Sequence, residues 1–215
     1  MRQASPDEER LRVKAEAAMR AAYPDARIIH ELVIGQCRLD LAAVTPDRLH
    51  VGEIKSDRDK LDRLGAQIAA ALTVADDVWL FAGAKHRAAV AHLGQRQLMD
   101  QIVKVKWGTT YARNPDYLAD LGQAHIVFET EDGLDRPQWD FRPGYRPHVP
   151  HHLLWLLWKA ELLDACHRYR FAADTRSTCS VMARQLADGL TGNEVRAATC
   201  TALRSRPFPR ADAPL

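Results

Sequence analysis

This sequence of 215 residues lacks three features that would restrict its function at once. Its four cysteines lie far apart and form no C-x-x-C pair, so we expect buried or idle thiols in a reducing compartment. The longest apolar run, Leu153–Trp158, is far shorter than a membrane span and ends at Lys159. Residues 1–14 are charged throughout, which is not the pattern of a signal peptide. These absences predict a cytoplasmic protein with no membrane partner.

The sequence also lacks a strong charge of either sign. Its 30 basic and 28 acidic residues give a net charge of +2, which neither requires nor excludes a nucleic-acid partner. The hydrophobic share of 47% is ordinary for a globular protein, and the length suits one α/β domain with a modest helical appendage. We find no internal repeat and no low-complexity tract.

The first half of the chain alternates between helical and strand-like patterns. Residues Pro6–Ala22 predict a helix, because Ser5 suits its N-cap and Pro24 closes it. The elements expected after it are strands at Arg27–Ile34, Cys37–Val44 and Leu49–Ile54, a helix at about Arg58–Val74 and a strand at Val78–Phe81. This α-β-β-β-α-β order implies a mixed β-sheet flanked by helices, in the α/β class.

Beyond Gly83 the patterns are weaker. The expected elements are a helix at 84–100, strands at His125–Glu129 and Gln138–Phe141, a proline- and histidine-rich linker at Arg142–His152, and helices at about Leu153–Tyr169, Ser177–Asp188 and Asn193–Ser205. We therefore divide the chain into an α/β domain at residues 1–145 and a C-terminal helical extension at residues 146–215.

Polar side chains on two neighbouring strands form the most informative pattern. Since side chains alternate along a strand, Arg38 and Asp40 share a face of the second predicted strand. Glu53 and Lys55 likewise share a face of the third, where buried charges are costly unless they pair or hold a metal. Asp40 beside Glu53 would form a carboxylate pair that suits Mg²⁺ or Mn²⁺. Lys55 in the same pocket could orient or deprotonate a water, or neutralise charge that develops on phosphorus.

The same residues allow a structural interpretation. Asp40 and Glu53 could pair with Arg38 and Lys55 in ordinary cross-strand salt bridges on a solvated face of the sheet. Judged on spacing alone, the two interpretations are equally open.

Asp40 followed by Glu53-Ile54-Lys55 resembles the signature of the PD-(D/E)xK nuclease superfamily, whose fold is that of restriction endonucleases. A wider set of residues resembles a branch of small bacterial and phage proteins in this superfamily, in which the run EIKSD precedes a helix that carries R-L and Q. The segments that carry this resemblance are Glu31–Ile34, Arg38–Asp40, Glu53–Asp59, Arg63-Leu64, Gln67 and Leu153–Leu163.

This resemblance implies a metal-dependent active site. Asp40 and Glu53 would ligate Mg²⁺ (or Mn²⁺), and the Ile54 carbonyl would add a third oxygen. Lys55 would be the catalytic lysine.

Glu31 matches the upstream acid of the family and is a further metal-ligand candidate, with Glu16 as its alternative. A structural or solvated role for Glu31 is equally open. The substrate-binding candidates are Arg38, Arg63 and Gln67. Arg63 and Gln67 could instead be ordinary residues of a helix surface.

The implied activity is hydrolysis of DNA phosphodiester bonds by a metal-activated water. In related exonucleases the helix glutamine is followed four residues later by tyrosine, whereas Ala71 stands here, which disfavours a processive exonuclease. The alternative is a non-catalytic DNA-binding or assembly protein that retains the nuclease fold.

The C-terminal part offers weaker signals. His148, His151 and His152 lack a suitably spaced cysteine or acid for a zinc site. The two last predicted helices form either a DNA-docking pair or, as we favour, a plain helical hairpin with arginines on its solvated face, and Thr191 with Glu194 fits a capping box. The apolar run Leu153–Trp158 either docks on the core or forms the face of a homodimer, and the sequence leaves the oligomeric state open.

Overall fold

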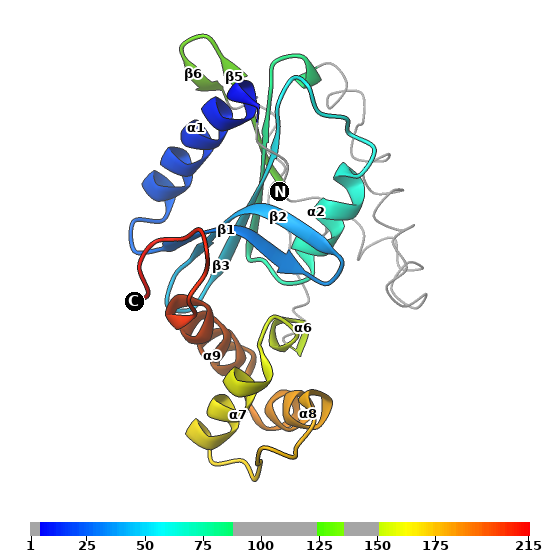
Figure 1. Ribbon diagram of the computed structural model, residues 1–215, viewed down its shortest axis with the longest axis vertical. Coiled ribbons are helices and arrows are strands. Elements are labelled where there is room, and N and C mark those ends of the chain that lie inside the picture. The colour runs from blue at the N-terminus through cyan, green and yellow to red at the C-terminus, as the bar shows by residue number, and fades with distance from the viewer. Residues whose placement is uncertain (1–4, 88–123, 136–150) are drawn as a thin grey trace.

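The computed structural model describes residues 5–87, 124–135 and 151–215 (Figure 1). At its centre is a six-stranded sheet whose strands lie in chain order. The strands are β1 (Arg27–Ile34), β2 (Cys37–Val44), β3 (Leu49–Lys55), β4 (Asp77–Ala82), β5 (Ala124–Thr130) and β6 (Gly133–Asp135). β1, β2 and β3 are antiparallel to one another, β3, β4 and β5 are parallel, and β6 returns antiparallel to β5. The predicted α/β class with a mixed sheet is confirmed.

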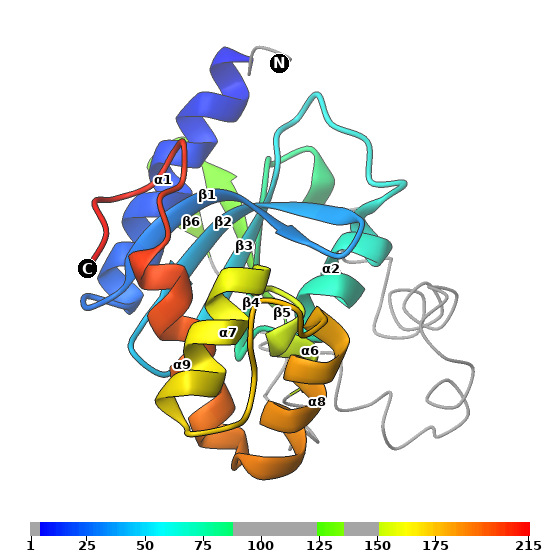
Figure 2. The ribbon, with the colours of Figure 1, turned by 60° about the horizontal axis from the view of Figure 1, so that its bottom comes forward.

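Helices cover both faces of this sheet. They are α1 (Pro6–Ala22), α2 (Leu64–Leu72), α6 (His151–Leu154), α7 (Lys159–Arg168), α8 (Cys179–Gly189) and α9 (Gly192–Ser205). On one face, Leu11 and Met19 of α1 pack with Phe81 in a compact hydrophobic cluster. On the other face, a larger cluster joins α2 and the C-terminal helices to the strands, for example through Ile68 and Leu203. Figure 2 shows the C-terminal helices gathered beside the sheet.

The predicted α-β-β-β-α-β order is present, and α1 begins where the sequence indicates, with Glu8 N–H donating to Ser5 Oγ at 3.2 Å. β5 is also confirmed, whereas β6 was not expected. The predicted strand Gln138–Phe141, most of the helix predicted at 84–100 and most of the linker at Arg142–His152 lie outside the described residues.

The prediction that the second helix begins at about Arg58 is wrong, since α2 begins at Leu64. The physical reason lies in the loop before it. Ser56 donates through its N–H and its hydroxyl to Asp59 Oδ2, at 2.8 and 2.7 Å. The Asp59 N–H in turn donates to the Ser56 carbonyl. These local hydrogen bonds hold residues 56–59 in a turn and compete with the helix.

The prediction of one helix at Leu153–Tyr169 is also wrong, because α6 ends at Leu154 and α7 starts at Lys159. Trp158 has extended backbone angles, and its N–H donates to the Glu161 side chain at 2.7 Å. A side chain that caps a backbone N–H in this way starts a new helix. The break leaves Trp155 and Trp158 more than half exposed.

The predicted hairpin of α8 and α9 is present, with the Thr191–Glu194 capping box in place. The expectation that these arginines are solvated is wrong, because those of α9 are only partly exposed and bind other parts of the protein. Arg196 pairs with Asp76 at 3.4 Å, and Arg204 donates to backbone carbonyls before β1 and at the end of β2. α9 is therefore held to the sheet by its arginines and does not present them as a DNA-docking surface.

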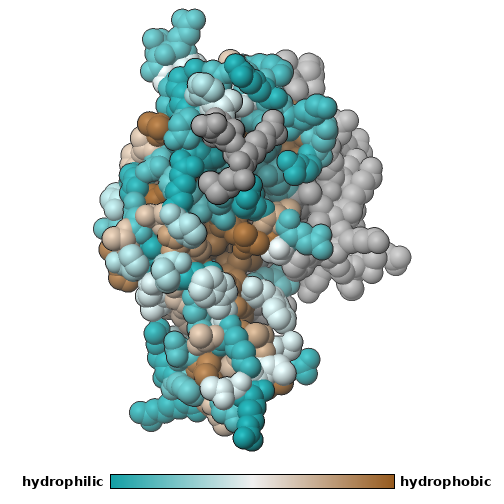
Figure 3. Space-filling model, viewed as in Figure 1, coloured by the Kyte–Doolittle hydropathy of each residue, from teal (hydrophilic) through white to brown (hydrophobic). Residues whose placement is uncertain are grey.

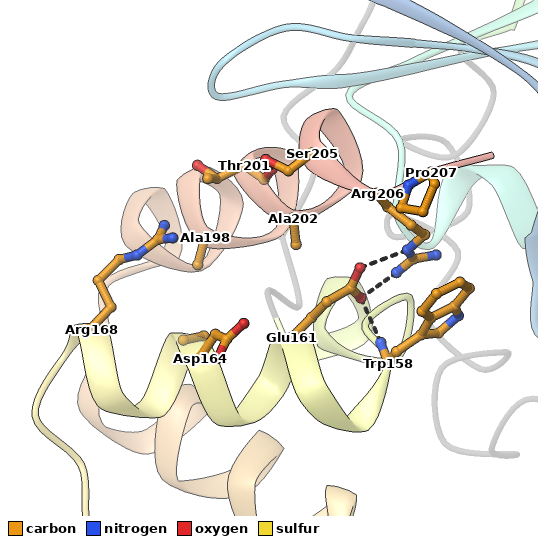
Figure 4. A pocket seen from close by; sticks show the side chains of 11 residues that line it. Trp158, Glu161, Asp164, Arg168, Ala198, Thr201, Ala202, Ser205, Arg206 and Pro207 are labelled. Carbon is orange, nitrogen blue, oxygen red and sulfur yellow. Dashed lines mark hydrogen bonds and ion pairs between the residues drawn. The ribbon is translucent and has the colours of Figure 1, made fainter. Parts of the chain in front are cut away.

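Arg206, directly after α9, joins this helix to α7. Its guanidinium forms a two-point ion pair with Glu161 and lies 4.4 Å from the ring centre of Trp158. These side chains close one end of a pocket of about 250 Å³ between α7 and α9 (Figure 4). Arg206 is buried, so it too is a structural contact.

The surface seen in Figure 3 is mostly hydrophilic, with hydrophobic residues gathered near its middle. No helix within the described residues is both long enough and apolar enough to span a membrane.

Candidate active site

The candidate site lies where β2 and β3 stop pairing. The last paired residues are Leu41 and Gly52, and the same register continued by one residue sets Asp40 opposite Glu53. Directly opposite residues of antiparallel strands share a face of the sheet. Asp40 Oδ2 accepts the Ile54 N–H at 2.9 Å, so a carboxylate takes over a strand hydrogen bond at this point. The two predicted carboxylates are therefore positioned by the backbone of adjacent strands.

Glu53 is the most enclosed charged group of the site, with 2% of its surface exposed. Lys55 Nζ and Gln67 Nε2 both donate to its Oε1. Its other oxygen, Oε2, is buried and has no hydrogen-bond partner among the described residues, and the same holds for Gln67 Oε1. Buried oxygens without a donor are rare, because each costs about 1–3 kcal/mol unless something satisfies it. These two oxygens are consistent with a cation site.

Burial raises the pKa of Glu53 to about 7, and the nearby charge of Asp40 adds to this rise. The charge of Lys55 and the hydrogen bonds from Lys55 and Gln67 act in the opposite direction. A divalent cation placed beside such a carboxylate would favour its ionised form.

The residues present fit Mg²⁺ or Mn²⁺ better than zinc. Within the part of the chain that the structure describes, no group of three or more His, Cys, Asp or Glu side chains is arranged to hold a metal ion. Mg²⁺ needs only one or two carboxylates, because it retains several waters. Asp40, Glu53 and the unpartnered amide oxygen of Gln67 supply hard oxygen donors of this kind. The Ile54 carbonyl stays a predicted ligand.

Asp40 has a second partner that the sequence did not reveal. The guanidinium of Arg12, on α1, donates to Asp40 Oδ1 at 3.2 Å and to the Asp40 carbonyl at 3.3 Å. Arg12 lies on the buried face of α1, between Leu11 and Ala15. A charged residue on the apolar side of a helix is the signal that could have identified it.

The structure does not bring Glu31 into a cluster with Asp40 and Glu53. Glu31 interrupts the pairing of β1 with β2, has a φ of 59°, and pairs with exposed Arg38 at 3.7 Å. Glu16, the alternative, pairs with Arg20 and His30.

The three substrate-binding candidates have different surroundings. Gln67 belongs to the site itself, because its amide contacts Glu53. Arg63 is exposed and lies just before α2. Burial raises the pKa of Cys37; the charge of Glu53 adds to this rise, and the charge of Arg63 opposes it. Arg38 extends into solvent from β2.

The loop after β3 is fixed against the loop after β4. His86 Nε2 is 2.8 Å from the Ser56 carbonyl, and the N–H of Lys85 donates to Asp57 Oδ1. Gly83 makes this contact possible, since a Cβ there would lie 2.2 Å from Asp57 Oδ1 and 2.8 Å from Asp57 N. Sequence patterns gave no sign of these contacts.

Comparison with known proteins gives a match to a family model. None of the curated proteins and none of the solved structures matched the chain. A family model matches a segment of the chain that contains Asp40, Glu53, Lys55 and Gln67. The description of this family names a phage, which agrees with the expected phage origin and carries no information on nuclease activity. Over residues 16–100 the chain is similar to the family described as Bacteriophage P4 protein cII.

Proposed function

We propose that this protein is a metal-dependent nuclease that hydrolyses DNA phosphodiester bonds with a metal-activated water. The observation that carries the proposal is the buried Glu53, which lies opposite Asp40, contacts Lys55 and retains an oxygen without a donor. Ionisable groups enclosed in this way are expensive to maintain for structure alone and are concentrated at functional sites.

Each residue has a distinct task in this proposal. The Ile54 N–H and Arg12 hold Asp40, while Gln67 holds Glu53, so both carboxylates are oriented before a metal binds. Bound Mg²⁺ or Mn²⁺ supplies Lewis acidity at the phosphate and makes a water acidic enough to react near neutral pH.

Lys55 has its Nζ on Glu53 Oε1, which places an ammonium inside the site. From there it orients the attacking water and neutralises charge on a phosphate oxygen.

DNA is the proposed substrate because exposed arginines lie within a few residues of Asp40, Lys55 and Gln67 along the chain. Arg38 and Arg58 have 65% and 70% of their side chains exposed, and Arg63 is also exposed. Arginines of this kind bind phosphate oxygens and fix the position of a nucleic acid without reading its sequence.

A second candidate function is a non-catalytic DNA-binding or assembly protein. One observation favours it: each carboxylate already has a cationic partner, Arg12 on Asp40 and Lys55 on Glu53. Two such ion pairs can stabilise a fold with no metal.

Cleavage by an Asp40→Asn variant tests the proposal. The amide oxygen can still accept the Ile54 N–H, so the fold should persist, while the loss of charge should abolish cleavage in Mn²⁺. Asp47→Asn, in the turn between β2 and β3, is the control and should cleave at the wild-type rate. Cleavage by Asp40→Asn at the wild-type rate would exclude Asp40 as a ligand. Wild-type protein that binds DNA equally with and without EDTA, and never cleaves it, would support the second function.

A further inference from the structure

Arg12 is a buried guanidinium at the edge of the candidate site. Its side chain is 4% exposed, and it donates to Asp40 Oδ1, to the Asp40 carbonyl and to Glu8 Oε1 at 3.2–3.3 Å. Glu9 lies 3.9 Å from its Nε. Burial of a charge at this depth is costly unless acidic partners compensate it, and here Asp40 is the partner that belongs to the site.

The metal-free site already holds one cation beside each of its two carboxylates. Arg12 pairs with Asp40, and Lys55 pairs with Glu53, so each carboxylate of the proposed metal site has its own cation. A divalent cation that enters meets the attraction of two carboxylates and the repulsion of two fixed positive charges. Since Coulomb energies are large in a poorly solvated site, removal of one of these positive charges should change the metal affinity measurably.

Asp40 would keep its orientation without Arg12. Its Oδ2 accepts the Ile54 N–H at 2.9 Å, and its backbone belongs to β2. The hydrogen bond from Arg12 reaches the other oxygen, Oδ1, at the longer distance of 3.2 Å. Arg12 therefore supplies Asp40 with a nearby positive charge more than it fixes the orientation of the carboxylate.

We infer that Arg12 is the resident counter-charge of Asp40 and lowers the affinity of the site for a divalent cation. This inference rests on the proposed function, because it requires that Asp40 and Glu53 bind a metal. Arg12 keeps the metal-free protein stable by offsetting the repulsion between the two carboxylates. It thereby sets the metal concentration at which the site becomes occupied.

Calorimetric titration with Mn²⁺ alone, without DNA, tests the inference. Arg12→Gln removes the charge and keeps a donor, and should bind Mn²⁺ about tenfold more tightly, equivalent to about 1.4 kcal/mol. Arg12→Lys keeps the charge and should stay within about twofold of the wild type. Arg20→Gln is the control on the same helix, since Arg20 pairs with Glu16 and Asp212 away from the site, and should bind as the wild type does.

Thermal melting gives a second readout. Without metal, Arg12→Gln should melt at a lower temperature than the wild type. Addition of Mn²⁺ should raise its melting temperature more than that of the wild type, because tighter binding stabilises the folded state further. If Arg12→Gln does not fold, the variant Glu8→Gln tests the inference in its place. This variant removes the Glu8 carboxylate, which lies closer to Arg12 than that of Glu9, so more of the positive charge of Arg12 acts on the site. Mn²⁺ should therefore bind several-fold more weakly than to the control Glu16→Gln.

The outcomes separate the two claims. A wild-type protein that binds no Mn²⁺ overturns the metal site and the inference together. A wild-type protein that binds Mn²⁺, with an Arg12→Gln variant that binds it equally or more weakly, overturns the role of Arg12 and leaves the proposed nuclease intact. Equal or tighter binding by Glu8→Gln than by Glu16→Gln also contradicts the inference.

Discussion

Lys55 is a lysine at the end of β3 whose side chain is 10% exposed and whose Nζ donates to Glu53 Oε1. Lys55→Met keeps most of the aliphatic length and removes the ammonium. Single-turnover cleavage at saturating Mn²⁺ should slow by about 10²-fold or more, the scale of losing a positioned acid–base or electrostatic group.

The control for this variant is Lys85→Met, which removes an exposed ammonium bonded to the Asp57 carbonyl. It should cleave at close to the wild-type rate. Full activity of a Lys55→Met protein whose melting curve shows a folded state would remove this lysine from the mechanism.

Asp77 is the first residue of β4 and lies at the end of the parallel strands that is opposite to Lys55. The hydrogen bonds from His125 and then His50 lower the pKa of Asp77, and burial opposes them. The His50 Nδ1 and Tyr23 hydroxyl lie 2.8 and 3.1 Å from its Oδ2. Since the carboxylate is the favoured form in the folded protein, its contribution to stability is present above its ordinary pKa of 3.8. The contribution is lost as the pH falls below that value, through the lowered pKa of the folded state.

Asp77→Asn should therefore reduce the free energy of unfolding by about 1–3 kcal/mol at pH 7. The difference from the wild type should shrink below about pH 4. Urea denaturation of both proteins at a series of pH values measures it. A difference that stays constant down to pH 2 would mean that the charge of Asp77 contributes nothing.

At the scale of elements, Gly83 determines how the loop after β3 meets the loop after β4. A Cβ at this position would lie 2.8 Å from the backbone nitrogen of Asp57, which cannot move as a flexible side chain can. Gly83→Ala should cost about 1–3 kcal/mol of stability, as overpacking usually does, and should lower cleavage by displacing the chain between Lys55 and α2.

Thermal melting and a cleavage assay check this prediction, with Ala84→Ser as the control at the exposed neighbouring position. A Gly83→Ala protein with unchanged melting temperature would show that the two loops separate without cost.

The strands and α1 could be predicted because their hydrophobic periodicity is local. β1, β2 and α1 have the predicted bounds, and Ser5 caps α1. The start of α2 could not be predicted, since the hydrogen bonds of Ser56 with Asp59 outweigh the helical pattern after Arg58. The break before α7 likewise depends on Glu161 turning back to the Trp158 N–H.

At the scale of the whole molecule, the C-terminal helices and the sheet share one hydrophobic cluster. Arg204 of α9 strengthens the packing of these helices on the sheet, because its Nη1 donates to the carbonyls of Asp25 and Val44, both at 2.8 Å. Arg204→Met should lower the free energy of unfolding by about 1–3 kcal/mol through the loss of these bonds. DNA affinity across a salt titration should stay unchanged, because the guanidinium faces the protein.

Urea denaturation and DNA binding of Arg204→Met are compared with Arg184→Met, which changes an exposed residue of α8. Arg184→Met should retain wild-type stability. Weaker DNA binding by Arg204→Met, without loss of stability, would restore the DNA-docking interpretation of α9.

Asp40, Glu53 and Lys55 could be placed together from sequence because strand alternation and a short hairpin fix their relative positions. The Arg12 contact with Asp40 could not, since it joins residues that are 28 positions apart through the packing of α1 on the sheet. Gln67 was expected on a helix and lies on one, but its contact with Glu53 joins residues 14 positions apart through the packing of α2 on β3.

Incubation of the purified protein with single-stranded, duplex and branched DNA tests the central claim most directly, with Mg²⁺, Mn²⁺ or EDTA in parallel. The proposed nuclease should cleave at least one of these DNAs with Mg²⁺ or Mn²⁺ and none of them in EDTA. Intact DNA under every condition, with binding that EDTA does not affect, would contradict a metal-dependent nuclease and favour a binding protein built on the same sheet.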